Sequence, residues 1–302
     1  MPQPSSPSPA RRTVIGSILP WIGVLAAFLA LLYLAAPTLA NVLLFHPSTG
    51  ALNSPPPLAG AAGEVVDDEA ADGIRLRHWW YEADPNAPIV ILFQGNAGHL
   101  GHRDFLAQGL IERGLSVLLV GYRGYGASEG RPTEEGLHRD ADAAIRWTAE
   151  RTGRSQDIVL LGRSLGAAVA AQAAIRHDIA GLVLDSGFTS LADAARAVYP
   201  ILPRFVLNRI TNRFGTLAAL ERFEGPVLVI HGTEDEIIPF RMGEALYAAA
   251  RPPKEWYPVP GARHNDLLLV AEDEYFDVVE DFARRAAKSD AAGGEPPPPI
   301  FP

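Results

Sequence analysis

Short apolar runs alternate along most of the chain with longer stretches suited to helices. The first runs, Glu64 to Asp67 and Ile74 to Glu82, flank Asp72-Gly73, which predicts an antiparallel pair of strands joined by a turn. The later runs are short and mostly apolar, and they suit strands buried on both faces of a sheet. They are Ile89 to Phe93, Ser116 to Val120, Ile158 to Leu161, Gly181 to Leu184, Val227 to Ile230 and Glu255 to Val259.

Helices fit between these strands, at Arg103 to Arg113, Thr133 to Arg151, Leu165 to Arg176, Arg241 to Ala250 and Asp266 to Ala287. Glu134 and Glu135 lie in the first turn of the second helix, where negative charge suits the helix dipole. This alternation is typical of an α/β domain with a doubly wound sheet, in which ligands bind at the carboxyl ends of the strands.

The N-terminal region is apolar over a much longer stretch. No charged residue occurs between Arg12 and Glu64, and a helix over Val14 to Ala36 would be about 35 Å long, enough to cross a membrane. Arg11 and Arg12 then place the amino end in the cytoplasm and the folded domain on the outer side, periplasmic or extracellular. A cleaved signal peptide or a twin-arginine signal is the alternative, but the apolar run exceeds the usual 7 to about 15 residues.

Composition divides the chain further. We expect a leader at 1–12, a transmembrane anchor with its flank at 13–45, a Pro/Gly-rich tether at 46–63, an α/β domain at 64–287 and a disordered tail at 288–302. The domain includes a candidate lid at 186–223, whose apolar part is interrupted by Pro200 and Pro203. A net charge of −9 and a pI near 5.4 argue against a nucleic-acid partner. The chain has no cysteine, which excludes disulfides and thiolate chemistry.

A turn that carries a serine follows the strand Ile158 to Leu161. It reads Gly162-Arg163-Ser164-Leu165-Gly166, the G-x-S-x-G pattern between a strand and a helix. Such a turn lifts the Ser164 hydroxyl above the edge of the sheet, and the backbone amide of Leu165 becomes a donor for a developing oxyanion. An ordinary glycine-bracketed turn is the alternative for this pentapeptide alone.

An acid and a histidine follow later strands. Asp235 lies beyond the strand Val227 to Ile230, and His264 lies between the strand Glu255 to Val259 and the last helix. In the order Ser164, Asp235, His264 they predict a triad in which serine attacks, histidine transfers the proton and aspartate orients the imidazole. Taken singly, each could be an ordinary surface residue, and Asp185 is the rival candidate for the acid.

The second oxyanion donor is expected in the loop after the strand Ile89 to Phe93. There Gln94-Gly95-Asn96-Ala97-Gly98 is rich in glycine, and we assign the backbone amide of Asn96 to this role, with Ala97 as the near alternative. A phosphate-binding loop is disfavoured because no lysine follows. We expect no metal site, since His99, His102 and His231 lack spaced partners.

The sequence resembles the α/β-hydrolase superfamily, in its branch of membrane-anchored α/β-hydrolase-domain or serine-aminopeptidase-like proteins. The segments that carry this resemblance span about Glu64 to Ala286. They are FQGNAG (93–98), GYRGYGASEG (121–130), GLHRDADAA (136–144), GRSLGAAVA (162–170), HGTEDEIIP (231–239) and GARHND (261–266). Gln94 departs from the family, which more often has histidine there. In the segment 121–130 we expect Tyr122, Arg123 and Tyr125 to brace a turn.

The resemblance implies a mostly parallel eight-stranded sheet with helices on both faces, preceded here by one transmembrane helix. It also implies hydrolysis of esters, thioesters or amides without a metal or organic cofactor. Peptidase activity is not inferred, because no acidic cluster is placed to hold a substrate amine. The anchor and the apolar lid favour a lipid-like acyl substrate. An acyltransferase that uses the same acyl-enzyme, or a non-catalytic binding protein on this fold, remains the alternative, and the sequence indicates no protein partner.

Overall fold

A computed structural model describes residues 9–50, 54–201, 203, 205 and 213–292. Most of the expected leader and tail, together with part of the candidate lid, lie outside these residues. The last helix continues to Ala292, five residues past the expected end of the domain at 287.

The centre of the domain is an eight-stranded sheet in the order β10-β9-β8-β7-β4-β6-β3-β2. At one edge β2 (Gly63–Glu69) and β3 (Arg75–Tyr81) are antiparallel to their neighbours. The remaining strands are parallel, so the predicted mostly parallel sheet is confirmed. They are β4 (Ile89–Phe93), β6 (Ser116–Leu119), β7 (Ile158–Arg163), β8 (Gly181–Asp185), β9 (Val227–Gly232) and β10 (Lys254–Val259).

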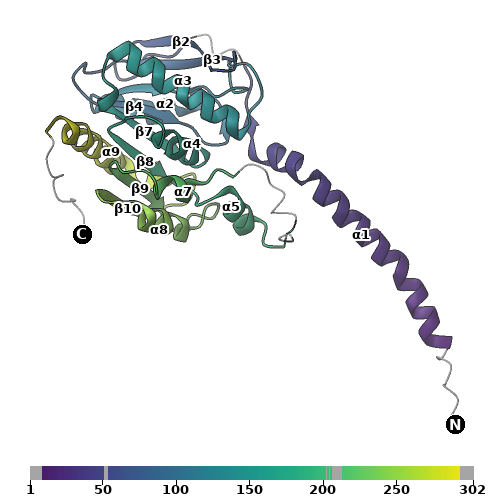
Figure 1. The fold of residues 1–302 in the computed structure, drawn as a ribbon. Coiled ribbons are helices and arrows are strands. Elements are labelled where there is room, and N and C mark those ends of the chain that lie inside the picture. The colour runs from purple at the N-terminus through teal and green to yellow at the C-terminus, as the bar shows by residue number, and fades with distance from the viewer. Residues whose placement is uncertain (1–8, 51–53, 202, 204, 206–212, 293–302) are drawn as a thin grey trace.

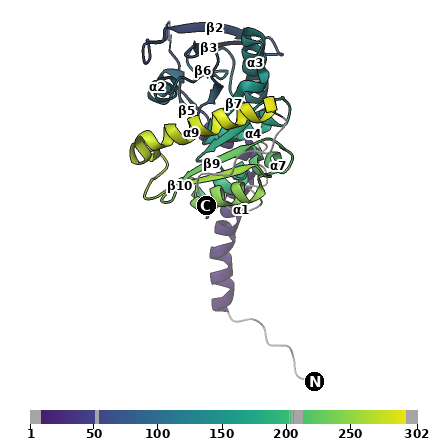
Figure 2. The same ribbon diagram turned by 90° about the vertical axis from the view of Figure 1, so that its left-hand side faces the viewer.

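Helices cover both faces of the sheet, which explains why the central strands are apolar throughout. One core cluster joins the sheet to α3 (Glu134–Thr152), α4 (Leu165–Ala174), α7 (Thr216–Leu220) and α8 (Phe240–Ala249). On the other face lie α2 (Asp104–Glu112) and α9 (Leu267–Ala292), and Figure 2 shows α9 crossing the sheet. The 3₁₀ turns η1 (Leu100–Arg103) and η2 (Ser155–Asp157) precede α2 and β7.

The N-terminal helix α1 runs from Pro9 to Leu44 and extends away from the domain (Figures 1 and 2). Its segment Pro20–Leu44 has 25 residues and a mean hydropathy of 2.2, so it is long and apolar enough to cross a membrane. Trp21 and Leu34 on this segment are 73% and 69% exposed. Among the side chains of α1 whose burial is described, from Pro20 onward, those of the last turns around the buried Ala36 pack against the rest of the protein.

The segment 46–63, expected as a tether, lies against the domain where the structure describes it. The short strand β1 (His46–Pro47) pairs in parallel with β5 (Ala97–Gly98). Leu58 is buried, and the Tyr81 hydroxyl donates to the Pro56 carbonyl at 3.1 Å. These contacts hold the end of α1 close to the loop after β4. The composition could not indicate them, because a Pro/Gly-rich stretch looks the same whether it is free or packed.

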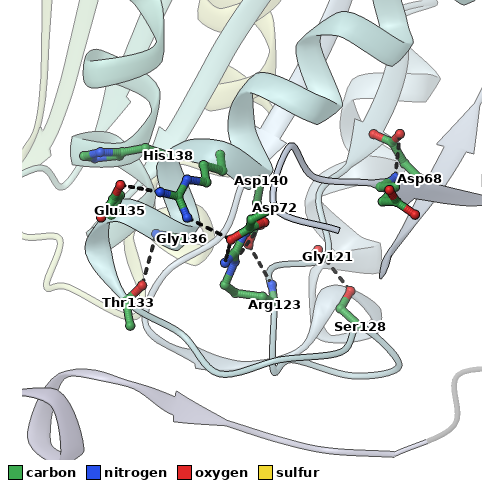
Figure 3. A network of polar contacts seen from close by, with 12 residues as sticks. Asp68, Asp72, Gly121, Arg123, Ser128, Thr133, Glu135, Gly136, His138 and Asp140 are labelled. Carbon is green, nitrogen blue, oxygen red and sulfur yellow. Dashed lines mark hydrogen bonds and ion pairs between the residues drawn. The ribbon is translucent and has the colours of Figure 1, made fainter. Parts of the chain in front are cut away.

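A buried arginine fixes the loop that follows β6. The backbone amide and Nε of Arg123 donate to the two carboxylate oxygens of Asp140, both at 2.8 Å, and its terminal nitrogens reach Asp72 at 2.8 and 2.9 Å. Figure 3 shows Arg123 between the two carboxylates, beside the start of α3, where the Gly136 amide donates to Thr133 Oγ1 at 3.0 Å. Arg123 therefore joins the turn before β3 to helix α3, and the expected bracing role is consistent with these contacts.

Replacing this side chain should be costly. Arg123→Leu keeps the backbone amide bond to Asp140 but removes the guanidinium, which leaves this fully buried carboxylate without its charged partner. The substitution should lower the free energy of unfolding by about 3 to 5 kcal/mol. The control Arg251→Leu removes an exposed pair with Glu224 and should cost less than about 1 kcal/mol. Urea denaturation of both variants measures the difference. Equal midpoints for the two would contradict this role of Arg123.

Candidate active site

The turn between β7 and α4 is forced into a conformation that exposes Ser164. Ser164 has φ 54° and ψ −114°, a strained backbone for a residue other than glycine, and its amide donates to the Asp185 carbonyl at 2.8 Å. A Cβ on Gly162 would lie 2.2 Å from the Gly166 carbonyl oxygen, and one on Gly166 would lie 2.0 Å from that of Phe93. Both glycines are therefore required by close backbone approach.

The predicted acid and histidine meet at the same edge of the sheet. β9 and β10 are parallel neighbours, so the loops that follow them lie side by side. His264 Nδ1 and Asp235 Oδ2 are 2.7 Å apart. Since an ionised carboxylate only accepts, Nδ1 carries the proton and Nε2 is left to accept one. This is the tautomer that a general base needs.

The Asp235 carboxylate is held by several donors. The amides of Ile237 and Ile238 donate to Oδ1 at 2.9 and 2.7 Å, and His231 Nε2 lies 3.4 Å from Oδ2. Burial alone would raise the pKa of Asp235, but hydrogen bonds from His231 and His264 outweigh it and hold the pKa well below its usual value. Asp235 is thus a charged acceptor fixed in one orientation.

His231 is a contributor that the sequence analysis missed. It is fully buried on β9, and its Nε2 also lies 2.8 Å from the Ile238 carbonyl oxygen, which can only accept. Its proton therefore points at the loop that carries Asp235. Gly243, on α8, faces the His231 ring. A Cβ at this position would lie only 2.6 Å from His231 Nδ1, so the ring packs closely against the helix. No spacing in the sequence signalled this packing.

Ser164 and His264 line one cavity of about 510 Å³, within the range usual for ligand pockets. Gly95, Asn96 and Leu165 line it too, while Asp235 lies behind His264 and is buried. Among the described residues the serine hydroxyl makes no direct hydrogen bond to the His264 ring. Catalytic hydrogen bonds are often long without substrate and shorten in the complex. The cavity therefore brings together the predicted nucleophile, base and oxyanion residues.

The loop after β4 is held from behind through its carbonyl groups. The Tyr122 hydroxyl donates to the Gln94 carbonyl at 3.2 Å, and the Tyr125 hydroxyl donates to the Asn96 carbonyl at 2.8 Å. The amide of His46 in β1 donates to the same Asn96 oxygen at 2.9 Å. With its carbonyls engaged away from the cavity, the loop presents Asn96 and Ala97 to it.

Asp185, the rival acid, is engaged elsewhere. Its carboxylate accepts from the hydroxyls of Ser186, at 2.8 Å, and Tyr275, at 3.1 Å, while His264 pairs with Asp235.

Gln94 is buried, and its side-chain nitrogen and oxygen have no hydrogen-bond partner among the described residues. Its side chain therefore has no visible role in the site.

Two arginines that the sequence analysis did not assign also line the cavity. Arg163 donates to the His264 carbonyl at 2.6 Å, and Arg103 donates to the Ala97 carbonyl at 2.8 Å. Burial, together with the nearby charge of Arg163, lowers the pKa of Arg103. Arg163 thereby supports the loop that carries His264, and Arg103 supports the loop that carries Asn96 and Ala97.

The described residues hold no group of three or more His, Cys, Asp or Glu side chains arranged to bind a metal ion. His99 and His102 stack on each other with ring centroids 3.8 Å apart.

Known proteins share much of this sequence. A family model described as serine aminopeptidase S33 matches residues 84–219. An uncharacterized protein of Mycobacterium tuberculosis is 39% identical over 248 residues, which cover 81% of this chain and 87% of that protein. The α/β-hydrolase domain-containing protein WAV2 of Arabidopsis thaliana is 30% identical over 289 residues, covering 88% and 92%. A protein of Saccharomyces cerevisiae named as an uncharacterized membrane protein is 33% identical over 218 residues, covering 70% and 76%.

The fold is also found among solved structures. An esterase of Pyrococcus furiosus matches with a TM-score of 0.66 and 20% identity, covering 80% of this chain and 98% of its own. The chain therefore belongs to the α/β-hydrolase superfamily, and the resemblance carried by its motifs is confirmed. Membership supports hydrolase activity in general, and the apolar helix together with the yeast relative's name points to membrane association.

The position of Asn96 should depend on the hydroxyl that holds its carbonyl. Tyr125→Phe removes that donor. With Asn96 in the oxyanion role expected from the sequence, its displacement weakens only transition-state binding, and kcat for a test ester should fall by about tenfold. KM should change little. Tyr247→Phe, on helix α8, is the matched control and should leave both constants unchanged. A rise in KM with kcat unaltered would show that the hydroxyl serves substrate binding instead.

Proposed function

We propose that the protein is a serine hydrolase that cleaves carboxylic ester or thioester bonds through an acyl-enzyme. The observation that carries this proposal is the 2.7 Å contact between Asp235 and His264, beside a cavity that His264 shares with the strained Ser164. Ser164 is the nucleophile, His264 the general base and acid, and Asp235 the residue that orients His264.

The reaction proceeds in two halves. The Ser164 oxygen forms a bond to the substrate carbonyl carbon while its proton passes to His264 Nε2, and the amides of Asn96 and Leu165 stabilise the resulting oxyanion. Collapse of this intermediate breaks the bond to the leaving alcohol or thiol, which takes the proton from His264. Water then attacks the acyl-enzyme by the same route, releases the acid and restores Ser164.

Chemical labelling tests the roles of these residues. A fluorophosphonate probe should label the protein at Ser164, and Ser164→Ala should abolish both labelling and turnover of p-nitrophenyl esters. Asp235→Asn should lower kcat by about 10⁴-fold, because the amide favours the wrong imidazole tautomer. Glu234→Gln, an exposed neighbour in the same loop, is the control and should keep full activity.

Turnover that persists in Ser164→Ala would show that Ser164 is not the nucleophile and that the activity arises elsewhere. Formation of a new ester when an alcohol is added would show instead that the acyl-enzyme transfers its acyl group to the alcohol.

For topology, we propose that α1 is retained as a membrane anchor, with its amino end in the cytoplasm and the domain on the outer side. The support is the pair Arg11 and Arg12 before an apolar segment that ends at Leu44, with the next charged residue at Glu64. The catalytic cavity then lies close to the outer face of the membrane that α1 crosses, because Leu44, the last residue of α1, also lines the cavity.

The absence of native cysteine makes this topology directly measurable. An impermeant maleimide applied to intact cells should label Asp178→Cys, at an exposed position in the domain, and should label Ser8→Cys only after the cells are lysed. The reverse pattern would overturn the orientation. A mature chain that lacks the first residues would show that the segment is a cleaved signal.

A further inference from the structure

A second cavity lies beside the catalytic one, between the membrane helix and the domain. Its volume is about 260 Å³. One wall is the C-terminal half of α1, with Ala36, Leu39 and Ala40, and the other is α5 (Leu191–Val198), with Ala195 and Val198. Among the described residues that line it, none is charged. Figure 1 shows α5 on the side of the domain from which α1 extends.

The two cavities are neighbours with a shared lining. Leu44, Asn96, Leu191, Ala194 and Ile237 line both. Asn96 is the proposed oxyanion donor, so the boundary between the cavities lies where the substrate carbonyl would sit. A chain attached to that carbonyl can therefore continue from the catalytic cavity into the space between α1 and α5.

The surroundings identify the chemistry of this chain. An apolar cavity without charged lining favours hydrocarbon, because burial of hydrocarbon removes apolar surface from water. The α1 wall is part of the segment that is apolar enough to cross a membrane. Leu39, in the wall formed by α1, is 42% exposed. Val198 at the end of α5 is 46% exposed, and Ile201 beyond it is 94% exposed. Apolar surface at this position suits contact with lipid.

We infer that the cavity between α1 and α5 holds the acyl chain of a long-chain ester or thioester that resides in the same membrane. The anchor helix is then one wall of the acyl-binding site as well as a tether. The inference rests on the proposed function, since it places the scissile carbonyl at Ser164. It predicts that side chains on α1, outside the hydrolase domain, set the preference for acyl-chain length.

Two substitutions narrow the cavity from opposite walls. Ala40→Trp acts from α1 and Ala195→Trp from α5, while Leu34→Trp, at an exposed position of α1 outside the cavity lining, is the matched control. The full-length protein is assayed in detergent micelles with p-nitrophenyl acetate and p-nitrophenyl palmitate. Both cavity variants should lower kcat/KM for palmitate about tenfold or more and leave acetate within about twofold, because each excluded methylene costs several-fold. The control should match the wild type on both esters.

Each other outcome has a definite meaning. The inference fails if the wild type does not hydrolyse the long ester, if both cavity variants leave its turnover unchanged, or if they change both esters equally. In those cases fluorophosphonate labelling of Ser164 and turnover of acetate would show that the hydrolase site stands. Retained turnover in Ser164→Ala would instead remove the proposed function itself. Because the two substitutions lie on opposite walls, misfolding of one variant does not invalidate the test. Turnover of acetate reports whether each variant is folded.

Discussion

The close backbone approach around Ser164 is the constraint on which the site depends. The turn Gly162 to Gly166 passes so near to β4 and to the start of α4 that no side chain fits at either glycine. The strained backbone of Ser164 is held by the bond from its amide to the Asp185 carbonyl, and by the packing of α4 on the sheet. The serine hydroxyl is therefore directed into the cavity by the fold, and the surrounding packing offsets the cost of the strain.

Charges and hydrogen bonds around this turn are arranged in layers. Nearest the cavity, His264, Asn96 and Leu165 line it. Behind them Asp235 fixes the imidazole, and His231 and two backbone amides fix Asp235. Behind the loop that follows β4, Tyr125 and β1 hold its carbonyls. Preorganised dipoles of this kind are effective because they need not reorient during the reaction.

The N-terminal helix α1 is joined to the candidate site through short local contacts. The end of α1 leads directly into β1, and β1 pairs with the strand that follows Asn96. Helix α1 and the loop after β4 are therefore connected by a few residues and by backbone hydrogen bonds. The end of α1 therefore lies in the lining of the cavity that contains Ser164, because Leu44 is part of that lining.

The sequence by itself determined the α/β class, the sheet with its antiparallel edge, the turn at Ser164 and the membrane-length helix, since each depends on local periodicity or on short spacing. It also identified Asp235 and His264 as candidates, because loops after parallel strands meet at one edge. Only the tertiary structure decided that Asp235 rather than Asp185 meets His264, that His231 and Tyr125 support the site, and that the segment 46–63 packs on the domain. Most of these contacts join residues far apart in the chain, and all of them depend on side-chain direction and packing, on which a single sequence carries no signal.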